Sequence, residues 1–221
     1  MKKAPYLLNR IVERYWELRL GINTRGTSAS AQLGARQDAV EYCPVPYRAF
    51  FRAMKHVPDK LLTGTFLDYG AGTGRALVLA ASYYNFRRVV GVEISAELCQ
   101  RAARNLEHVA AGQSEIVCCD ATNYHPPSDT TVFFLYNPFF GETMKMVVHN
   151  LRNSLLENPR CAAIVVCRPV HFIAATAGQD WFTERAAGKM LSSFSWRVFV
   201  TRVGVGPDAG PSGEQPWSPS D

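Results

Sequence analysis

The sequence has 221 residues, of which 47% are hydrophobic and 19% charged, and its formal net charge is +5. This length fits one domain with an appendage, and the apolar content suffices for a sizeable core. The mild positive charge permits an acidic partner without indicating one. The six cysteines form no Cys-x-x-Cys pair, so we interpret them as reduced, packing residues of a cytoplasmic protein. No stretch resembles a signal peptide or a membrane span, so we expect no membrane partner.

The first stretch of the chain has the periodicity of an amphipathic helix. Its apolar side carries Leu7, Leu8, Ile11, Val12, Tyr15, Trp16 and Leu18. Its polar side carries Asn9, Arg10, Glu13, Arg14 and Glu17. Such a helix either packs on the main domain or docks a partner or substrate. Residues 21–36 are mostly small and polar, which predicts a flexible connector, so we assign residues 1–36 to an N-terminal helix and connector.

Residues 37–47 hold two prolines with a tyrosine on either side, which predicts a stiff, extended segment. A helix is expected over 47–57, because Pro58 marks its end. Two roles are open for the stiff segment. It either covers a cofactor pocket, to which Tyr47 would contribute, or connects elements by packing in the core.

A glycine-rich stretch organises the rest of the chain. A short apolar run ends in Asp68, and the sequence continues Tyr-Gly-Ala-Gly-Thr-Gly, with glycines at 70, 72 and 74 around Ala71. The pattern predicts a strand, a tight turn and the start of a helix. Glycines let the backbone approach a ligand closely, and the amides of a helix N-terminus point at it. A carboxylate at the strand end suits a cation, so we predict that Asp68 holds an ammonium group of a cofactor.

The glycine spacing discriminates between cofactors. A dinucleotide-binding fingerprint requires Gly-x-Gly-x-x-Gly. Counted from Gly70 and Gly72, the third small residue would be Arg75, and counted from Gly72 and Gly74 it would be Leu77. The spacing therefore disfavours an NAD-dependent oxidoreductase.

Two further predicted strands also end in acids. The strand over 88–93 ends in Glu93, and the strand over 115–120 ends in Asp120. Glu93 can accept from the hydroxyls of a ribose, and Asp120 with the amide of Ala121 would suit an adenine. The alternatives are a surface acid for Glu93 and a turn or helix cap for Asp120. Three acids at successive strand ends would share the edge where open α/β sheets bind ligands.

Strands and helices alternate through the middle of the chain. Helices are predicted over 75–85, 96–108 and 142–156, and further strands over 131–136 and 161–167. This alternation predicts a parallel sheet with right-handed crossovers. A short helix over 170–177 and a strand over 196–203 fit a final antiparallel pair. Residues 204–221 are dense in glycine and proline, so we predict a disordered tail and a main domain over 37–203.

Four motifs, taken in order, resemble those of class I S-adenosylmethionine (SAM)-dependent methyltransferases. They are Asp68–Gly74, Glu93, Asp120-Ala121 and Asn137-Pro138-Phe139. The resemblance covers about residues 37–203 and extends to uncharacterised bacterial members of the class. It implies an α/β fold with a doubly wound, mostly parallel seven-stranded sheet and an N-terminal helical extension. It also implies that the glycine loop with Asp68 holds the methionine part of SAM, Glu93 the ribose and Asp120 the adenine.

Asn137-Pro138-Phe139 is similar to the Asn-Pro-Pro-Tyr/Phe motif of methyltransferases that act on amino groups. The Asn137 side-chain oxygen and the Pro138 carbonyl can both accept from an NH2 group, which leaves its lone pair aimed at the methyl group. An aromatic residue then stacks on a flat substrate, and Phe139 stands where the motif has its second proline. The alternative is a turn that closes the fourth strand.

Other activities fit the sequence less well. The loop Gly-Ala-Gly-Thr-Gly differs from the Gly-Gly-Gly-x-Gly of aminopropyltransferases, and the hydrolase motifs G-x-S-x-G and H-E-x-x-H are absent from the sequence. The five histidines show no metal-ligand spacing, so no metal is expected. A non-catalytic SAM-binding or interaction protein is the alternative from another class. The methyl acceptor is left open between a protein side chain, a small amine and a nucleic acid.

Overall fold

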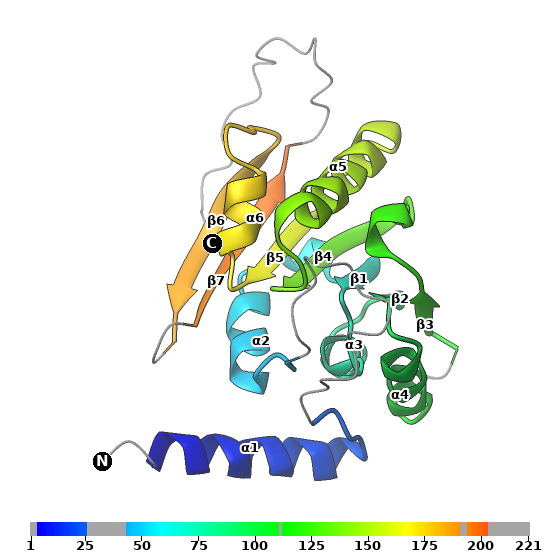
Figure 1. Cartoon of the computed structure of the whole chain (residues 1–221), viewed down its shortest axis with the longest axis vertical. Helices are drawn as coiled ribbons and strands as arrows, with labels where there is room; N and C mark the ends of the chain where they lie inside the picture. The colour runs from blue at the N-terminus through cyan, green and yellow to red at the C-terminus, as the bar shows by residue number, and fades with distance from the viewer. Residues whose placement is uncertain (1–3, 26–42, 111, 191–193, 203–221) are drawn as a thin grey trace.

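The computed structural model describes residues 4–25, 43–110, 112–190 and 194–202 (Figure 1). The predicted tail 204–221, residues 37–42 and most of the predicted connector lie outside these ranges. Every helix within the described ranges is too short or too polar to cross a membrane.

The described strands form a seven-stranded, mostly parallel sheet, which confirms the predicted α/β fold. The strands are β1 (Thr65–Tyr69), β2 (Arg88–Glu93), β3 (Ser114–Cys118), β4 (Thr130–Tyr136), β5 (Ala163–Cys167), β6 (Phe182–Lys189) and β7 (Ser195–Thr201). Their order across the sheet is β3-β2-β1-β4-β5-β7-β6. The first five run parallel, and β7 pairs antiparallel with both β5 and β6. This order puts β1 and β4 side by side, with their carboxyl ends at the same edge.

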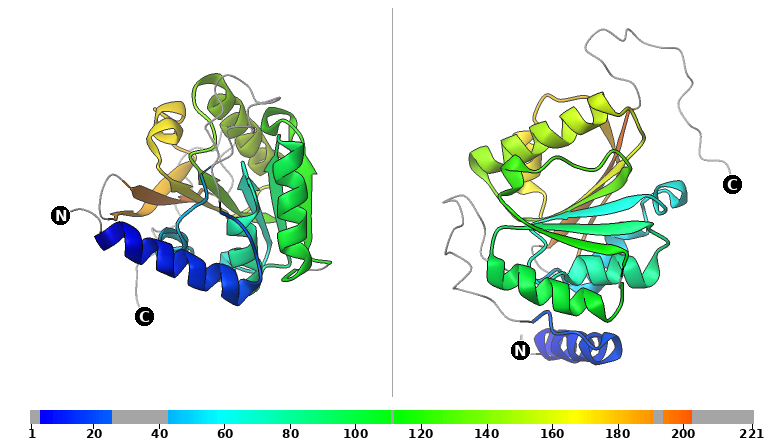
Figure 2. Two further views of the ribbon diagram at one scale, coloured as in Figure 1. Left: turned by 60° about the horizontal axis from the view of Figure 1, so that its bottom comes forward. Right: turned by 90° about the vertical axis from the view of Figure 1, so that its right-hand side faces the viewer.

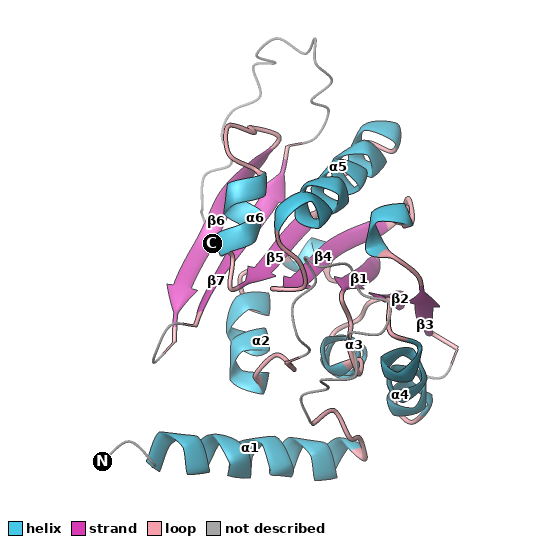
Figure 3. Cartoon of the chain, viewed as in Figure 1, coloured by secondary structure: helices cyan, strands magenta, loops and turns pink. Residues whose placement is uncertain are grey.

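Helices cover both faces of this sheet (Figures 2 and 3). They are α1 (Ala4–Leu20), α2 (Tyr47–Met54), α3 (Arg75–Tyr83), α4 (Ala96–Glu107), α5 (Gly141–Glu157) and α6 (Val170–Ala175), with single 3-10 turns at Asp59–Leu61 and Ala121–Asn123. One core cluster joins α2, α3 and α4 to the sheet, and a second joins α5 and α6 to its other face. Burial of these two apolar faces is the main stabilising contribution.

Local sequence explains where several of these elements begin and end. Ser95 caps α4 by accepting from the amide of Leu98 at 3.4 Å, as its position before the helix indicated. Strand β3 ends at Cys118, two residues before the predicted end at Asp120. Strand β6 could not be assigned from sequence because its residues are largely exposed, so it lacks the apolar alternation that identifies strands.

Helix α1 lies outside the layer formed by α2, α3 and α4, and it presents a different side to the domain from the one its apolar pattern suggests (Figure 2). Glu17, on the predicted polar side, is only 5% exposed, whereas Leu18, on the predicted apolar side, is 72% exposed. Trp16 and Leu20 pack against the core beside Glu17. The reason is a buried cation, Arg75, which Glu17 contacts.

Candidate functional site

The glycine loop connects the end of β1 to α3 with left-handed backbone at three positions. Gly70, Gly72 and Gly74 have φ values of 73°, 57° and 80°, which side chains rarely tolerate. The amides of Gly70 and Ala71 both donate to the Val92 carbonyl, at 2.8 and 3.0 Å. The loop is therefore tied to β2, and it turns tightly over the carboxyl ends of the central strands.

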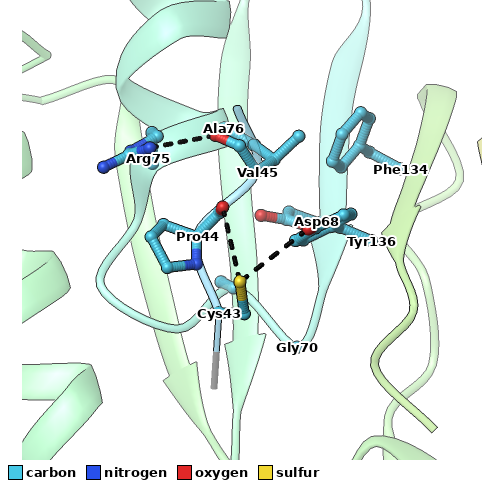
Figure 4. Close-up of a pocket in the computed structure, with 10 residues that line it drawn as sticks. Cys43, Pro44, Val45, Asp68, Gly70, Arg75, Ala76, Phe134 and Tyr136 are labelled. Atoms are coloured by element: carbon cyan, nitrogen blue, oxygen red, sulfur yellow. Dashed lines mark hydrogen bonds between the residues drawn. The ribbon is translucent and has the colours of Figure 1, made fainter. Parts of the chain in front are cut away.

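Asp68 lies at the base of a small pocket beside this loop, as Figure 4 shows. The pocket is lined by Cys43, Pro44, Val45, Asp68, Gly70, Ala71, Arg75, Ala76, Phe134 and Tyr136. Asp68 is 3% exposed, and burial raises the pKa of its carboxyl well above the ordinary value, with a further contribution from the charge of Glu93. A cation bound here would reverse this effect, because an opposite charge favours the ionised form. The pocket thus suits the ammonium group that the sequence predicts.

Glu93 anchors the glycine loop. One of its carboxylate oxygens, Oε2, accepts from the amide of Gly72 at 2.9 Å. The other, Oε1, accepts from the amides of Ile94 at 2.9 Å and Ser95 at 3.0 Å. An ionised carboxylate offers about four lone-pair positions, and these three backbone amides occupy three of them. This geometry leaves capacity for one ribose hydroxyl rather than two.

Asp120 caps the short turn that follows β3. Its Oδ1 atom accepts from the amide and the hydroxyl of Thr122, at 2.9 and 2.7 Å. Ala121, the first residue of that turn, is buried. The turn-cap alternative therefore describes Asp120 in this structure, and a contact to adenine stays a prediction for both residues.

The Asn137-Pro138-Phe139 motif begins directly after β4 and lies against the glycine loop. A Cβ on Gly70 would stand 2.6 Å from the Cβ of Pro138, so only glycine allows this approach. Asn137 has a φ of 46°, which is uncommon outside glycine and is found most often in Asn and Asp. The structure thus brings Asn137 and Pro138 together with Gly70 and Asp68 at one sheet edge.

The prediction for Phe139 needs correction. Its ring is 9% exposed and belongs to the core cluster on the α5 side of the sheet, so it cannot stack on a substrate. The next residue, Phe140, is 39% exposed and packs on His171 with the ring centroids 5.7 Å apart. The motif's fourth position is aromatic in the family pattern, and that signal points to Phe140.

Tyr47 also lies elsewhere than predicted. Its hydroxyl donates to Glu17 Oε1 at 3.0 Å, and its ring stacks on Trp16 with the centroids 5.5 Å apart. It is not among the residues that line the pocket. The stiff segment before it lines the pocket through Cys43, Pro44 and Val45, whereas Tyr47 packs in the core, and the covering of a cofactor by this segment stays a prediction.

A buried polar network that sequence reasoning missed fixes this segment. The Arg75 guanidinium donates to Thr24 Oγ1 at 2.7 Å, to the Val45 carbonyl at 3.1 Å and to Glu17 Oε1 at 3.2 Å. It also pairs with Glu13 at 2.8 Å and covers the Tyr47 ring at 4.5 Å. Only the position of Arg75 directly after the glycine motif could have drawn attention to it.

Cys43 and Tyr136 form the other side of the pocket, and neither was predicted as a site residue. The Cys43 thiol lies 3.9 Å from the Tyr136 hydroxyl (Figure 4). Burial raises the pKa of Tyr136, and Cys43 raises it further, whereas the charge of Arg168 lowers it. In the described ranges, no group of three or more His, Cys, Asp or Glu side chains is placed to hold a metal ion.

Comparisons with known proteins agree with this geometry. Residues 66–155 match the family model described as a methyltransferase domain. A curated protein-lysine N-methyltransferase from Saccharolobus islandicus is 33% identical over 79 residues, which make up 35% of this chain and 48% of that protein. The chain thus spans about half the length of this curated relative.

Solved structures share the fold. An RNA methyltransferase from Salinibacter ruber, in complex with S-adenosyl-L-homocysteine, has a TM-score of 0.54 at 21% identity, covering 75% of this chain and 98% of that one. A SAM-dependent methyltransferase from Aquifex aeolicus has a TM-score of 0.53 at 13% identity, covering 69% of this chain and 89% of that one. At these identities, the likeness concerns the fold alone.

Proposed function

We propose that this chain is an active SAM-dependent methyltransferase that methylates an amino nitrogen of a protein, with the lysine side chain as acceptor. The match of residues 66–155 to the methyltransferase-domain model and the strand order of the sheet support the reaction class. The lysine assignment rests on its partial similarity to the protein-lysine N-methyltransferase. The nitrogen assignment rests on the Asn137-Pro138 motif, which resembles that of amino-group methyltransferases.

The observation that carries this proposal is the contact between Pro138 and Gly70. A Cβ on Gly70 would overlap the Pro138 ring at 2.6 Å, so the loop predicted to hold the methyl donor touches the motif predicted to hold the acceptor. Methyl transfer is an in-line displacement that requires donor and acceptor to be held close and aligned. Two polypeptide segments separated by nearly 70 residues are here in van der Waals contact at one sheet edge.

The residues at this edge fit SAM and would divide its binding between them. SAM supplies an electrophilic methyl group on a sulfonium centre. Asp68 would pair with the ammonium group of the methionine part, and Glu93 Oε2 has capacity for one ribose hydroxyl.

Asn137 would orient the acceptor. Its side-chain oxygen and the Pro138 carbonyl accept the two N–H groups of a neutral amine and direct the lone pair outward. A lysine ammonium must first lose a proton, and its ordinary pKa is about 10.4. Entry into a partly apolar pocket lowers that value because burial disfavours the charged form. The proton leaves to solvent before transfer, so the site needs no strong base.

The test is transfer of label from methyl-tritiated SAM into a cell lysate that is afterwards separated into protein, nucleic-acid and small-molecule fractions. We expect label in protein, released as methyllysine on acid hydrolysis, and much less label with the Asp68→Asn variant. Label confined to RNA would replace the lysine assignment with an RNA acceptor. If SAM binds but no fraction is labelled, the non-catalytic SAM-binding alternative is correct.

A further inference from the structure

Two left-handed residues lie side by side at the carboxyl ends of β4 and β5. Tyr136 pairs with Cys167 in the parallel register, so Asn137 and Arg168 are the next residues of two adjacent strands. Their φ values are 46° and 56°, and among the described residues they are the only non-glycine residues with positive φ. Such backbone is strained for a residue with a side chain and persists where the surroundings enforce it, frequently at functional sites.

The backbone of Arg168 is held in place by a hydrogen bond. The Arg168 amide donates to the Ser195 carbonyl at 2.8 Å, which ties the turn to β7. Its side chain is exposed, and none of the ion pairs between described residues includes it. By contrast, Arg75 and Arg197 each pair with a glutamate.

Arg168 directly follows Cys167, the register partner of the pocket-lining Tyr136, so its backbone lies beside the pocket that holds Asp68. Its charge acts on the hydroxyl of Tyr136, lowering the pKa of that group against the stronger effect of burial. Tyr136 lines the pocket and contacts Cys43. Arg168 therefore places a positive charge beside the acceptor motif, on the side of the sheet edge toward β5.

Apolar side chains lie on the segments that follow Asn137 and Arg168 in the chain. Phe140 follows the acceptor motif and packs on His171 of α6. Val170 and Ile173, also on α6, are 69% and 39% exposed. A surface that combines an arginine with exposed aromatic and aliphatic groups suits a polypeptide better than a small hydrophilic amine.

We propose that Arg168 forms an anion subsite that recognises a carboxylate of an acidic residue next to the methylated lysine of a protein substrate. The proposal rests on the proposed function, since it presumes a protein acceptor held at Asn137. The guanidinium fork can bind a carboxylate through two parallel hydrogen bonds, which fixes the position of the substrate chain as well as its charge. Arg168 is then a specificity-determining residue, distinct from the groups that would hold SAM.

The experiment uses the full chain, labelled SAM and three synthetic peptide pools, each with a central lysine flanked by acidic, neutral amide or basic residues. The variants are Arg168→Gln, Arg168→Glu and, as matched control, Arg104→Gln on the exposed side of α4. We expect the wild-type protein to methylate the acidic pool about tenfold faster than the neutral pool, the size of a charge-assisted pair. Added salt should reduce this preference.

In Arg168→Gln the preference should fall to within about twofold, and Arg168→Glu should favour the basic pool, as expected from exchanging one charge of a pair. Arg104→Gln should behave as wild type. An unchanged preference in Arg168→Gln overturns the proposal. So does a weaker affinity of Arg168→Gln for SAM with unchanged affinity for 5′-methylthioadenosine, because Arg168 would then bind the carboxylate of SAM itself.

Binding of the same fluorescently labelled pools to the protein saturated with S-adenosylhomocysteine separates this proposal from the proposed function. Tighter binding of the acidic pool that disappears in Arg168→Gln supports the subsite, even where no pool is methylated and the lysine assignment fails. Equal binding of all three pools in the absence of turnover overturns the subsite as well.

Discussion

Arg75, the first residue of α3, donates to the carboxylate of Glu17 on α1 at 3.2 Å, and both side chains are buried. The same guanidinium donates to the Val45 carbonyl, so one side chain joins the N-terminal helix, the glycine loop and the segment that lines the pocket. Because Arg75 directly follows Gly74, the conformation of the predicted SAM loop depends on this network.

Replacing Arg75 with Met should lower the free energy of unfolding by about 3–5 kcal/mol, because it leaves the Glu17 carboxylate buried without its cation. Removing both charges in Arg75→Met/Glu17→Leu should cost less than the single change. Lys145→Met removes the exposed ion pair with Glu142 and should stay within about 1 kcal/mol of wild type. Urea denaturation measures all three, and an Arg75→Met protein as stable as Lys145→Met would contradict the network's role.

Gly70→Ala should abolish SAM binding and lower the melting temperature, because the new methyl group would stand 2.6 Å from Pro138. Gly178→Ala is the matched control. Its φ is 76°, close to the 73° of Gly70, but a Cβ there meets nothing within 4 Å. Both variants carry the backbone strain of about 1 kcal/mol, and only Gly70→Ala carries the clash. Equal melting temperatures and equal SAM affinities in the two variants would show that the contact is unimportant.

Most of the fold and part of the site could be predicted from sequence. The positions of Asp68, Glu93 and Asn137 at one sheet edge could be predicted because the ends of parallel strands meet at one edge, and their roles in binding stay predictions. The direction in which individual side chains point was harder to predict from sequence than the strand order. Phe139 is a core residue. Tyr47 contacts Glu17 because both side chains pack against the buried guanidinium of Arg75, which lies 28 residues after Tyr47 in the sequence.

Arg168 illustrates what sequence could not provide. The fifth strand was predicted to end at Cys167, but nothing in the residue types announces left-handed backbone at an arginine. That conformation depends on the hydrogen bond to Ser195 across the sheet, a contact between residues 27 apart. The burial of Glu17 depends in the same way on a partner distant in sequence.

SAM affinity should fall as the pH is lowered, through the protonation of Asp68. Burial raises the pKa of this carboxyl, and only the ionised form pairs with an ammonium group, so binding releases a proton near and below the raised pKa. Calorimetry in buffers of different ionisation enthalpy measures this release. Asp68→Asn should bind SAM about 2 kcal/mol more weakly, the worth of a charged hydrogen bond, with no such proton release.

The raised pKa of Asp68 also makes the free energy of unfolding depend on pH in the absence of ligand. A carboxyl whose folded pKa is raised favours the folded state at pH values below its ordinary pKa, and this contribution is lost as the pH rises through the folded pKa. As the pH rises from the ordinary pKa to the raised pKa, the wild-type protein should therefore become less stable relative to Asp68→Asn. A difference that stays constant with pH would mean that Asp68 is not the titrating group.

Alkylation of Cys43 should block SAM binding, since this exposed thiol lines the pocket beside Tyr136. We expect N-ethylmaleimide to lower SAM affinity at least about tenfold in the wild-type protein, because the added group would occupy the pocket. Cys43→Ser should bind SAM normally and resist the reagent. Loss of binding in treated Cys43→Ser would assign the effect to another thiol, such as the exposed Cys118.

We propose that Asn137 orients the acceptor while other residues hold SAM. The left-handed φ of 46° at this residue makes Asn137→Gly the sharpest variant, because glycine keeps the backbone and removes only the side chain. The decisive measurement is the rate of methyl transfer to lysine peptides alongside the SAM dissociation constant of this one variant. We predict a rate lower by about 10²-fold, as when one positioned polar group is lost, with the dissociation constant within about twofold of wild type. Unchanged transfer, or a loss of SAM affinity as large as the loss of rate, would contradict this role of Asn137.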